Sequence, residues 1–534
     1  YKRQTLTTFC GVSGGFEDAM RQERSLYADF LANIDKTFGD FHLTANVGAS
    51  IYHTSMDQLY IAGDLVIPNF FQINNINFSA NYKPDPTGYE DEIQSIFASA
   101  ELSWKNQLYL TVTGRNDWDS KLAFSKQKSF FYPSVGLSAL LSEMVKLPEV
   151  ISYAKIRGSY TVVASSFDRF LTNPGYEYNS QTHNWANPTV YPMDNMKPEK
   201  TKSWEIGLNL KFWGNRFNLD ATYYRSNTLN QTFKVDIPSS SGYKQAIVQA
   251  GNVQNQGLEL ALGFNDKWAG FGWSSNATFT LNRNKVKRLA SGSVNPVTGE
   301  AIQMDEMNVG WLGKENVAPR VILTEGGSMT DIYVYNQLTK DNNGNIKVDQ
   351  NGNLGITSSN TPVKVGNLDA DFNLGWTNHF TYKGIDLGVV LSARVGGLAY
   401  SATQGILDYY GVSGTSATAR DNGGIPINNG KVNAQKYYQT IGTGEGGYGR
   451  YYLYSATNVR LQELSLNYTL PKRWFKNVAN VTLGIVGRNL WMIYCKAPFD
   501  PELSASTSSN YYMNVDYFMQ PSLRNFGFNV KVQF

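Results

Sequence analysis

The stretch Asn525-Phe-Gly-Phe-Asn-Val-Lys-Val-Gln-Phe534 decides the fold class of this chain. Successive side chains of a β-strand point to opposite faces, so a segment that alternates in this way has one apolar face and one polar face. Strands of a transmembrane β-barrel are about 9–11 residues long, with apolar positions toward lipid and polar positions toward the lumen. We therefore predict a closing barrel strand in which five side chains mediate membrane insertion: Phe526, Phe528, Val530, Val532 and Phe534.

The composition suits a fold that has only one apolar face per strand. Hydrophobic residues make up 42% of the 534 residues, slightly below the usual globular share of about 45–50%. Aromatic residues reach 13%, with 33 tyrosines, and aromatic girdles are typical of the two membrane interfaces of a barrel. A large soluble β-protein that binds carbohydrate shares this bias, so composition leaves that alternative open.

Charge and cysteine content exclude several classes of protein. The net charge of +3 is small and dispersed, so no nucleic-acid partner is expected. No run approaches the ~18 consecutive apolar residues of a transmembrane helix. For Cys10 and Cys495 we expect two unpaired thiols, with a single disulfide as the alternative. These cysteines and the four scattered histidines have no metal-ligand spacing, so no metal or other cofactor is expected from them.

Alternating segments recur along the whole chain. Residues 41–51 place Phe, Leu, Ala, Val and Ile on one parity, and polar residues or Gly on the other. Residues 204–223 and 372–395 each predict a hairpin, with short turns at Gly214-Asn215 and Lys383-Gly384. Counting all such segments gives roughly fourteen to sixteen antiparallel strands.

The predicted connectors alternate in length. The long ones are rich in Gly, Asn, Ser and Tyr and cover residues 54–92, 163–202, 287–371, 396–456 and 494–523. Short periplasmic turns and long extracellular loops are typical of outer-membrane barrels. We therefore expect the long connectors to lie outside the cell and to carry much of the specificity. A helical pattern is visible only over residues 142–150.

A series of short stretches can be followed in order over about residues 91 to 534. The strongest block comprises Lys197-Pro-Glu-Lys-Thr-Lys-Ser-Trp-Glu-Ile-Gly-Leu208, Tyr223-Tyr-Arg-Ser-Asn-Thr228 and Asn252-Val-Gln-Asn-Gln-Gly-Leu-Glu-Leu260. The others are Gly114-Arg-Asn-Asp-Trp-Asp-Ser120, Phe131-Tyr-Pro-Ser-Val-Gly-Leu-Ser-Ala139, Lys155-Ile-Arg-Gly-Ser-Tyr160, Val365-Gly-Asn-Leu-Asp-Ala-Asp-Phe-Asn-Leu-Gly375, Thr457-Asn-Val-Arg-Leu-Gln-Glu-Leu-Ser-Leu-Asn-Tyr-Thr-Leu-Pro471, Gly487-Arg-Asn-Leu490 and Asp500-Pro-Glu502. Together these stretches resemble the C-terminal part of the SusC-like TonB-dependent transporters of Bacteroidota.

The resemblance implies a 22-stranded, plugged barrel of the bacterial outer membrane, of which residues 1–534 form one partial domain at the C-terminal end. It implies TonB-dependent active uptake of oligosaccharides or peptides, without enzymatic activity, and a SusD-like surface lipoprotein as extracellular lid. The other implied partners are outer-membrane lipid, the N-terminal part of the same transporter, and TonB acting through that part. Two transporter–lipoprotein pairs could form a dimer.

By itself the chain is not expected to close a barrel. Tyr1-Lys-Arg-Gln-Thr-Leu6 lacks the apolar core of a signal peptide, so we expect the chain to be part of a longer exported polypeptide. The strand count also falls short of that of the family barrel. Because the partner of the closing strand lies upstream in the family, we expect residues 525–534 to find no partner strand on their free side within this chain.

Two loop motifs are candidate binding sites. The stretch from Asp341 to Asn353 resembles a calcium loop, in which oxygen ligands repeat at every second position. Asn345 stands where the family has a second Asp, and Lys347 adds a positive charge, so we favour a polar turn and keep calcium as the alternative. Candidate substrate contacts crowd residues 167–196: Tyr176, Tyr178, His183, Trp185 and Tyr191.

Aromatic side chains with a polar tip suit sugar or peptide ligands. The alternative, which we favour for the 167–196 segment, is packing on the loop itself or on a partner protein. Tyr409-Tyr410 and Tyr451-Tyr452 carry the same ambiguity, and we assign them to the aromatic girdle.

Enzymatic function finds no support in the sequence. It contains no phosphate-binding Gly-x-x-x-x-Gly-Lys-Ser/Thr loop. Asp117 and Asp119 share one face of a predicted strand, and we interpret them as polar lumen residues rather than an acid–base pair. The remaining alternative to a transporter is a soluble or surface-attached carbohydrate-binding β-protein, whose apolar faces would pack against a second sheet.

Overall fold

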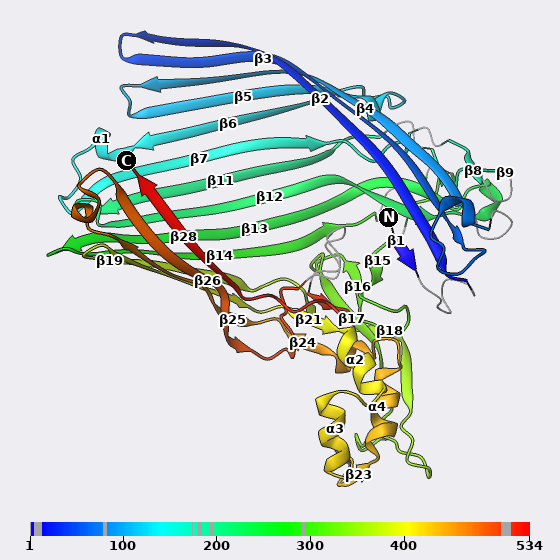
Figure 1. The fold of residues 1–534 in the computed structure, drawn as a ribbon. Helices are drawn as coiled ribbons and strands as arrows, with labels where there is room; N and C mark the ends of the chain where they lie inside the picture. Colours follow the sequence, from blue (N-terminus) through cyan, green and yellow to red (C-terminus); the bar gives the residue numbers. More distant parts are fainter. Residues whose placement is uncertain are drawn as a thin grey trace.

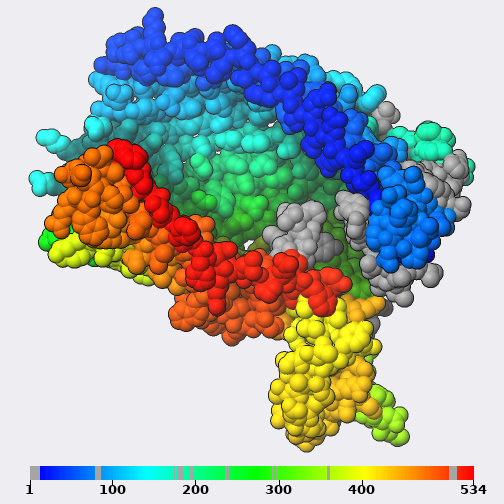
Figure 2. Space-filling view, viewed as in Figure 1, coloured from blue at the N-terminus to red at the C-terminus, as the bar shows by residue number. Residues whose placement is uncertain are grey.

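A single antiparallel sheet dominates the structure, a computed structural model that describes residues 2–4, 13–77, 83–172, 175–179, 184–192, 196–290, 294–295, 297–302, 304–503 and 514–534. The sheet forms a curved wall around a hollow (Figures 1 and 2). Within the described residues, fifteen long strands follow one another along the wall in chain order: β2 (Gly15–Phe38), β3 (Phe41–Asp64), β4 (Lys83–Trp104), β5 (Leu108–Asp119), β6 (Phe130–Leu140), β7 (Ile151–Ser165), β11 (Glu199–Phe212), β12 (Phe217–Asp236), β13 (Gln245–Trp268), β14 (Phe271–Arg288), β19 (Phe372–Tyr382), β20 (Ile385–Val395), β25 (Asn458–Thr469), β26 (Asn480–Cys495) and β28 (Asn525–Gln533). The predicted all-β barrel architecture and strand count are confirmed.

The outer face of the wall carries a continuous apolar belt. Strand register aligns its members: Phe528 of β28 pairs with Ile485 of β26, which pairs with Leu466 of β25. The same parity is apolar near the opposite edge, where Phe30 of β2 pairs with Ala49 of β3. No second sheet covers this face within the described residues, and Phe528 and Phe30 are 85% and 71% exposed. Such a belt is the lipid-facing surface of a transmembrane barrel.

Aromatic side chains border the belt at the end where the strands are joined by short turns. Three pairs flank these turns with ring centroids 5.3–6.3 Å apart: Phe38 and Phe41, Trp213 and Phe217, and Trp268 and Phe271. They correspond to the aromatic girdle of a barrel. The assignment of Tyr409-Tyr410 and Tyr451-Tyr452 to this girdle was wrong, because these residues lie in long connectors at the opposite end of the wall.

The wall does not close on itself. Among the described residues β28 pairs with β26 and with no other strand. The opposite edge strand, β2, pairs with β3 and, at its far end, with the short β1 (Lys2–Gln4). Figure 2 shows the hollow open between the blue edge formed by β2 and the red edge formed by β28. This agrees with the prediction that the closing strand has a free edge.

The two ends of the wall differ as predicted. Short turns such as residues 39–40, 105–107 and 383–384 lie at one end, and the long connectors lie at the other (Figure 1). The predicted connector 54–92 is too long, because β3 runs to Asp64 and β4 begins at Lys83. Beyond the belt neither face of β3 or β4 meets lipid, so apolar and polar side chains no longer alternate there. The backbones of the two strands stay paired all the same.

The long connectors between β14 and β19 and between β20 and β25 fold into a separate packed body, which we call the loop lobe (described residues of 289–371 and 396–457; Figure 1). A four-stranded sheet forms part of it: β15 (Glu306–Trp311), β16 (Arg320–Thr324), β17 (Asp331–Leu338) and β18 (Ile356–Asn367). The largest hydrophobic core of the described chain lies between the lobe and the adjoining ends of β12, β13 and β14. Its fully buried members in the lobe include Leu312, Ile332, Leu368, Tyr400 and Tyr452.

Helices are few and short. The helix predicted over 142–150 is the single turn α1 (Leu141–Met144), and three helices of the loop lobe were missed: α2 (Ala402–Tyr409), α3 (Gly414–Asp421) and α4 (Ala434–Gly442). Each of the three begins after a Ser or Asn whose side chain accepts a backbone N–H bond, for example Ser401 from Gln404. In the described part of the chain, no helix combines the length and apolarity needed to cross a membrane.

Candidate functional site

The inner face of the wall is lined by hydrogen-bonded charged groups. Arg157 of β7 reaches across β11 to Asp220 of β12, with an Nη2–Oδ1 distance of 3.1 Å, and also donates to Thr222 at 2.6 Å. Asn209 of β11 donates to the other Asp220 oxygen at 2.9 Å. The neighbouring lumen position on β11 is Gly207, where a Cβ atom would lie 2.5 Å from the Arg157 guanidinium. A glycine here leaves room for the arginine to lie flat across the strand.

A second inner-face network lies on β4, β5 and β6. Arg115 donates to Asp117 and to Ser95, both at 2.7 Å, and the Tyr132 hydroxyl donates to the second oxygen of Asp117. Asp119 shares the face of Asp117, as predicted, but its carboxylate accepts the Lys121 backbone N–H at 2.9 Å. The two acids thus have separate partners, which supports their interpretation as lumen residues.

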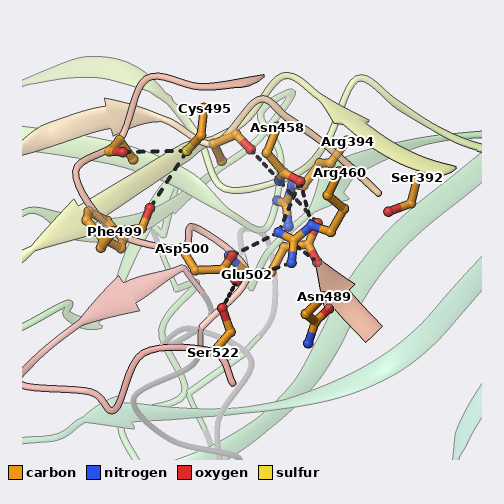
Figure 3. Close-up of polar contacts among 12 residues, drawn as sticks. Ser392, Arg394, Asn458, Arg460, Asn489, Cys495, Phe499, Asp500, Glu502 and Ser522 are labelled. Carbon is orange, nitrogen blue, oxygen red and sulfur yellow. Dashed lines mark hydrogen bonds and ion pairs between the residues drawn. The ribbon is translucent and has the colours of Figure 1, made fainter. Parts of the chain in front are cut away.

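The most buried ion pair lies at the long-loop end of the inner face (Figure 3). Arg460 of β25 donates a bidentate pair of hydrogen bonds to Asp500, with Nη1–Oδ2 and Nη2–Oδ1 distances of 3.1 and 2.9 Å. The two side chains are only 7% and 9% exposed. Asn458 accepts from the Arg460 Nε and Nη2 atoms and donates to Glu502 at 3.1 Å. Every atom of the guanidinium that can donate therefore has a partner, as a buried charge requires.

This cluster anchors the connector between β26 and β28. Burial alone would raise the pKa of the Asp500 carboxyl, but hydrogen bonds from Arg460 and from Ser522 outweigh it and hold that pKa below its usual value. Residues 500 and 522 come from the two ends of the connector, so one carboxylate fastens both ends to the wall. The ion pair is thus a fixed structural joint at physiological pH.

The middle of the same connector is attached to the loop lobe. Asn514 accepts from Arg394 of β20 at 3.2 Å and donates to the carbonyls of Leu368 and Leu398. Asp516, in β27 (Val515–Asp516), accepts from Ser401 at 2.6 Å, and β27 pairs in parallel with β21 (Leu398–Ser401). A single connector therefore links the closing hairpin of the wall to the lobe.

Sequence reasoning did not identify this joint. The stretches 457–471 and 500–502 were both noted, but as parts of a resemblance and without a role. The two partners are 40 positions apart and lie in a strand and a loop, so no short-range spacing relates them. The sequence does show an arginine among the polar positions of a strand and an acidic Asp-Pro-Glu element in a later loop. It does not show that the two come together.

The structure separates the predicted substrate contacts. Tyr178 and Trp185 face each other across the small hairpin of β8 (Glu177–Asn179) and β9 (Asn184–Ala186), with ring centroids 5.1 Å apart. Both are exposed, as is Tyr176. Tyr191 lies apart from them and packs edge-on against Tyr243 on the rim of the main core, and His183 falls outside the described residues. Among the four described residues, Tyr191 thus has a packing partner different from that of the Tyr178–Trp185 pair, and the ligand role of all five remains a prediction.

The segment from Asp341 to Asn353 forms two successive turns of the same design. Asp341 accepts the backbone N–H groups of Asn343 and Asn345, and Asp349 accepts those of Asn351 and Asn353, all at 2.7–2.9 Å. In each turn the bond to the later asparagine N–H is the main cause that lowers the aspartate pKa. The carboxylates thus shape the backbone of both turns, and the choice between a polar turn and a calcium site stays a prediction.

Other candidate ligands do not assemble. Within the described ranges, no group of three or more His, Cys, Asp or Glu side chains could hold a metal ion. The half-buried Cys495 thiol donates to the Ala497 and Phe499 carbonyls at 3.5 and 3.7 Å. Cys10 falls outside the described residues, so the expectation of two unpaired thiols stays a prediction.

Comparison with known proteins yields matches that cover about half of the longer relatives. The family model "TonB dependent receptor-like, beta-barrel" matches residues 2–321. TonB-dependent receptor P3 of Formosa agariphila is 24% identical and is aligned over 100% of this chain and 55% of its own length. TonB-dependent receptor SusC of Bacteroides thetaiotaomicron is 25% identical over 80% of this chain and 43% of its own length. The chain therefore spans about half the length of the curated relatives it matches.

Solved structures share the fold. The structure titled "Structure of the RagAB peptide transporter" has a TM-score of 0.73 at 16% identity, and covers 97% of this chain and 56% of the RagAB chain. A closed-closed state of the RagAB peptide importer gives 0.72. The predicted resemblance and the outer-membrane location are confirmed by these matches, and the expectation of a non-enzymatic protein agrees with a family of receptors.

Proposed function

Because the chain belongs to the TonB-dependent receptor-like β-barrel family, we propose that it supplies the C-terminal part of an outer-membrane importer for oligosaccharides or peptides. The observation that carries this proposal is the two-faced wall. Its outer belt is apolar and exposed, its inner face holds networks such as Arg157–Asp220, and its closing strand leaves one edge unpaired. A wall of this kind surrounds a polar passage and needs further strands to complete it.

The proposed partners follow from the parts that such a passage requires. Strands that pair with the edges of β2 and β28, and a plug, come from the N-terminal part of the same transporter. TonB acts on that part to release substrate inward, and a SusD-like lipoprotein covers the extracellular mouth. The long-loop end of the wall, with its packed lobe, supplies a surface for such a lid. A dimer of two transporter–lipoprotein pairs stays a prediction.

The substrate class is proposed as oligosaccharide or peptide because the SusC-like resemblance implies both, and a solved structure with the same fold is titled a peptide transporter. The exposed Tyr178–Trp185 pair suits either ligand, or equally a partner protein, since aromatic rings stack on sugar and pack on apolar side chains. The soluble carbohydrate-binding alternative predicts apolar rows packed against a second sheet. The exposed belt contradicts that alternative.

Uptake by intact cells tests the proposal. A strain that lacks the gene and a strain complemented with the full-length protein are grown on a mixture of isotope-labelled oligosaccharides and peptides. We expect one class to disappear from the medium only in the complemented strain, and a proton-motive-force uncoupler to stop its uptake. Equal consumption of both classes by the two strains contradicts the proposal.

The orientation of the wall is tested separately. External protease should cut the full-length protein within residues 163–202, 287–371 or 396–456 once any lid is removed, and should spare the turn at Gly214-Asn215. Cleavage at that turn with uncut long connectors would invert the topology.

A further inference from the structure

The turn between β25 and β26 concentrates positive charge beside the apolar belt. Lys472, Arg473 and Lys476 fall within five residues of one another, and all three are exposed. The first two belong to a short 3₁₀ turn, Lys472–Phe475, and the Asn477 N–H closes over it by donating to the Lys472 carbonyl at 3.0 Å. A compact backbone thus holds three cations close together.

A fourth cation comes from the neighbouring turn between β19 and β20. The Thr469 N–H donates to the Gly384 carbonyl at 2.7 Å, which places Lys383 beside the end of β25. Gly384 has a φ of +88°, a conformation that favours glycine in a two-residue turn. The Lys383 Nζ atom lies 5.1 Å from the centre of the exposed Tyr382 ring.

These four cations have no carboxylate partner among the described residues, since none takes part in an ion pair. The nearest acids along the same strands, Asp386 and Glu463, lie on the lumen parity and approach His379 and Arg488 instead, at 3.7 and 2.7 Å. By contrast, two cations at other turns of the same rim are paired. Lys105 contacts Asp40 at 3.4 Å and Arg216 contacts Asp266 at 3.2 Å.

Large apolar side chains accompany the charges. Trp474 and Val478, on the same turn, are 62% and 66% exposed. Four residues before Lys472, Tyr468 of β25 pairs with Leu483 of β26 and Ile385 of β20, which belong to the outer belt. Tryptophan is enriched at the headgroup level of a membrane, and lysine and arginine extend their charges from apolar surface into that layer. The turn therefore combines the two features that a headgroup contact requires.

We propose that this basic turn cluster, formed by Lys383, Lys472, Arg473 and Lys476, binds the headgroup phosphate of an anionic phospholipid in the leaflet on the turn side of the wall. The occupant follows from position, because the cluster continues the lipid-facing belt at its border. Basic residues beside a membrane surface attract acidic lipid, and the exposed Trp474 would lie at the level of the headgroups. The inference is independent of the nutrient that the transporter carries.

The test measures lipid binding by the full-length protein in nanodiscs. Phosphatidylglycerol and phosphatidylcholine compete in the annulus, and native mass spectrometry counts the lipids retained. We expect the Lys472→Gln/Arg473→Gln/Lys476→Gln variant to lose the preference for phosphatidylglycerol by about tenfold or more, and high salt to weaken the preference of the parent protein. The matched control is Lys105→Gln/Arg216→Gln, which removes paired cations from the same rim and should keep the preference.

A heat-modifiability assay on gels verifies that each variant is a folded barrel. An unchanged preference in the folded triple variant overturns the proposal, as does an equal loss in the control. If the triple variant keeps its lipids but no longer retains a periplasmic protein that copurifies with the parent, the cluster is a protein-docking surface and the lipid assignment is wrong.

Discussion

The wall and the loop lobe solve the problem of burying apolar surface in opposite ways. In the wall, side chains such as Phe528 and Phe30 stay exposed at the outer face, where lipid replaces a protein core. In the lobe, Ile332 and Tyr400 are fully buried in a packed interior, as in a soluble domain. Two different environments therefore stabilise this chain: lipid covers the apolar face of the wall, and protein packing buries the apolar side chains of the lobe.

The largest expected effect is at the joint between the two regions. Asp500→Asn removes the more buried of the two carboxylates that contact Arg460 and leaves only Glu502, at 3.4 Å. Breaking a buried ion pair costs up to about 3–5 kcal/mol. We expect hydrogen exchange in the full-length protein to rise in residues 496–503 and 519–524, and in residues 398–401 of the lobe. Faster exchange confined to one of the two regions would show that the connector does not couple them.

The same joint gives a pH prediction. The native pKa of Asp500 is depressed, so its contribution to stability is present above the unfolded pKa of about 3.9 and is lost as pH falls through the lower native pKa. Exchange in residues 496–503 should therefore be protected equally at pH 8 and pH 5 after correction for intrinsic rates. Loss of protection within that range would contradict the depressed pKa.

A core substitution in the lobe should leave the wall intact. Ile332→Ala removes a fully buried side chain at a cost of about 2–5 kcal/mol. We expect trypsin to cut residues 289–371 faster, while the heat-modified gel shift of the barrel is unchanged. If the variant also fails to assemble in the membrane, the lobe is needed for the wall to fold, and the contrast drawn above is too sharp.

An added positive charge in β28 should impair assembly at the outward-facing positions and be tolerated at the lumen-facing positions. Val530→Arg puts a charge in hydrocarbon at a cost of about 2–4 kcal/mol near the midplane, and Phe528→Arg should behave in the same way. Asn529→Arg, on the lumen parity of the same strand, is the matched control and should assemble normally. Similar amounts of all three variants in the outer membrane would refute the assignment of faces.

The smallest effect on stability is expected at the aromatic hairpin. Trp185 is 68% exposed, so Trp185→Ala should change stability by less than about 0.5 kcal/mol. If the Tyr178–Trp185 pair contacts ligand or lid, uptake or lid retention falls nonetheless. Phe124→Ala, at another exposed aromatic of the same end, is the control, and equal behaviour of the two variants would leave the pair without a functional role.

Much of the wall was predictable because lipid imposes a period of two on every strand that crosses it. The alternation at residues 41–51 and 525–534 predicted strands and their outward faces, whereas the free edge of the last strand was implied by the family resemblance. The same reasoning failed beyond the belt, where β3 continues to Asp64 and polar residues such as His53, Ser55 and Asp57 interrupt its outer apolar parity. It also missed α2, α3 and α4, whose eight or nine residues are too short for a clear helical period.

The sequence by itself determined that this chain is one side of a membrane barrel with a polar lumen, since each strand carries that information locally. The packing of the connectors, in contrast, is visible only in the tertiary structure. The core beneath the lobe joins residues from 233 to 515, and the ion pair of Arg460 with Asp500 joins a strand to a loop. Such contacts form wherever three-dimensional packing excludes water from groups that are distant in sequence, and no local pattern records them.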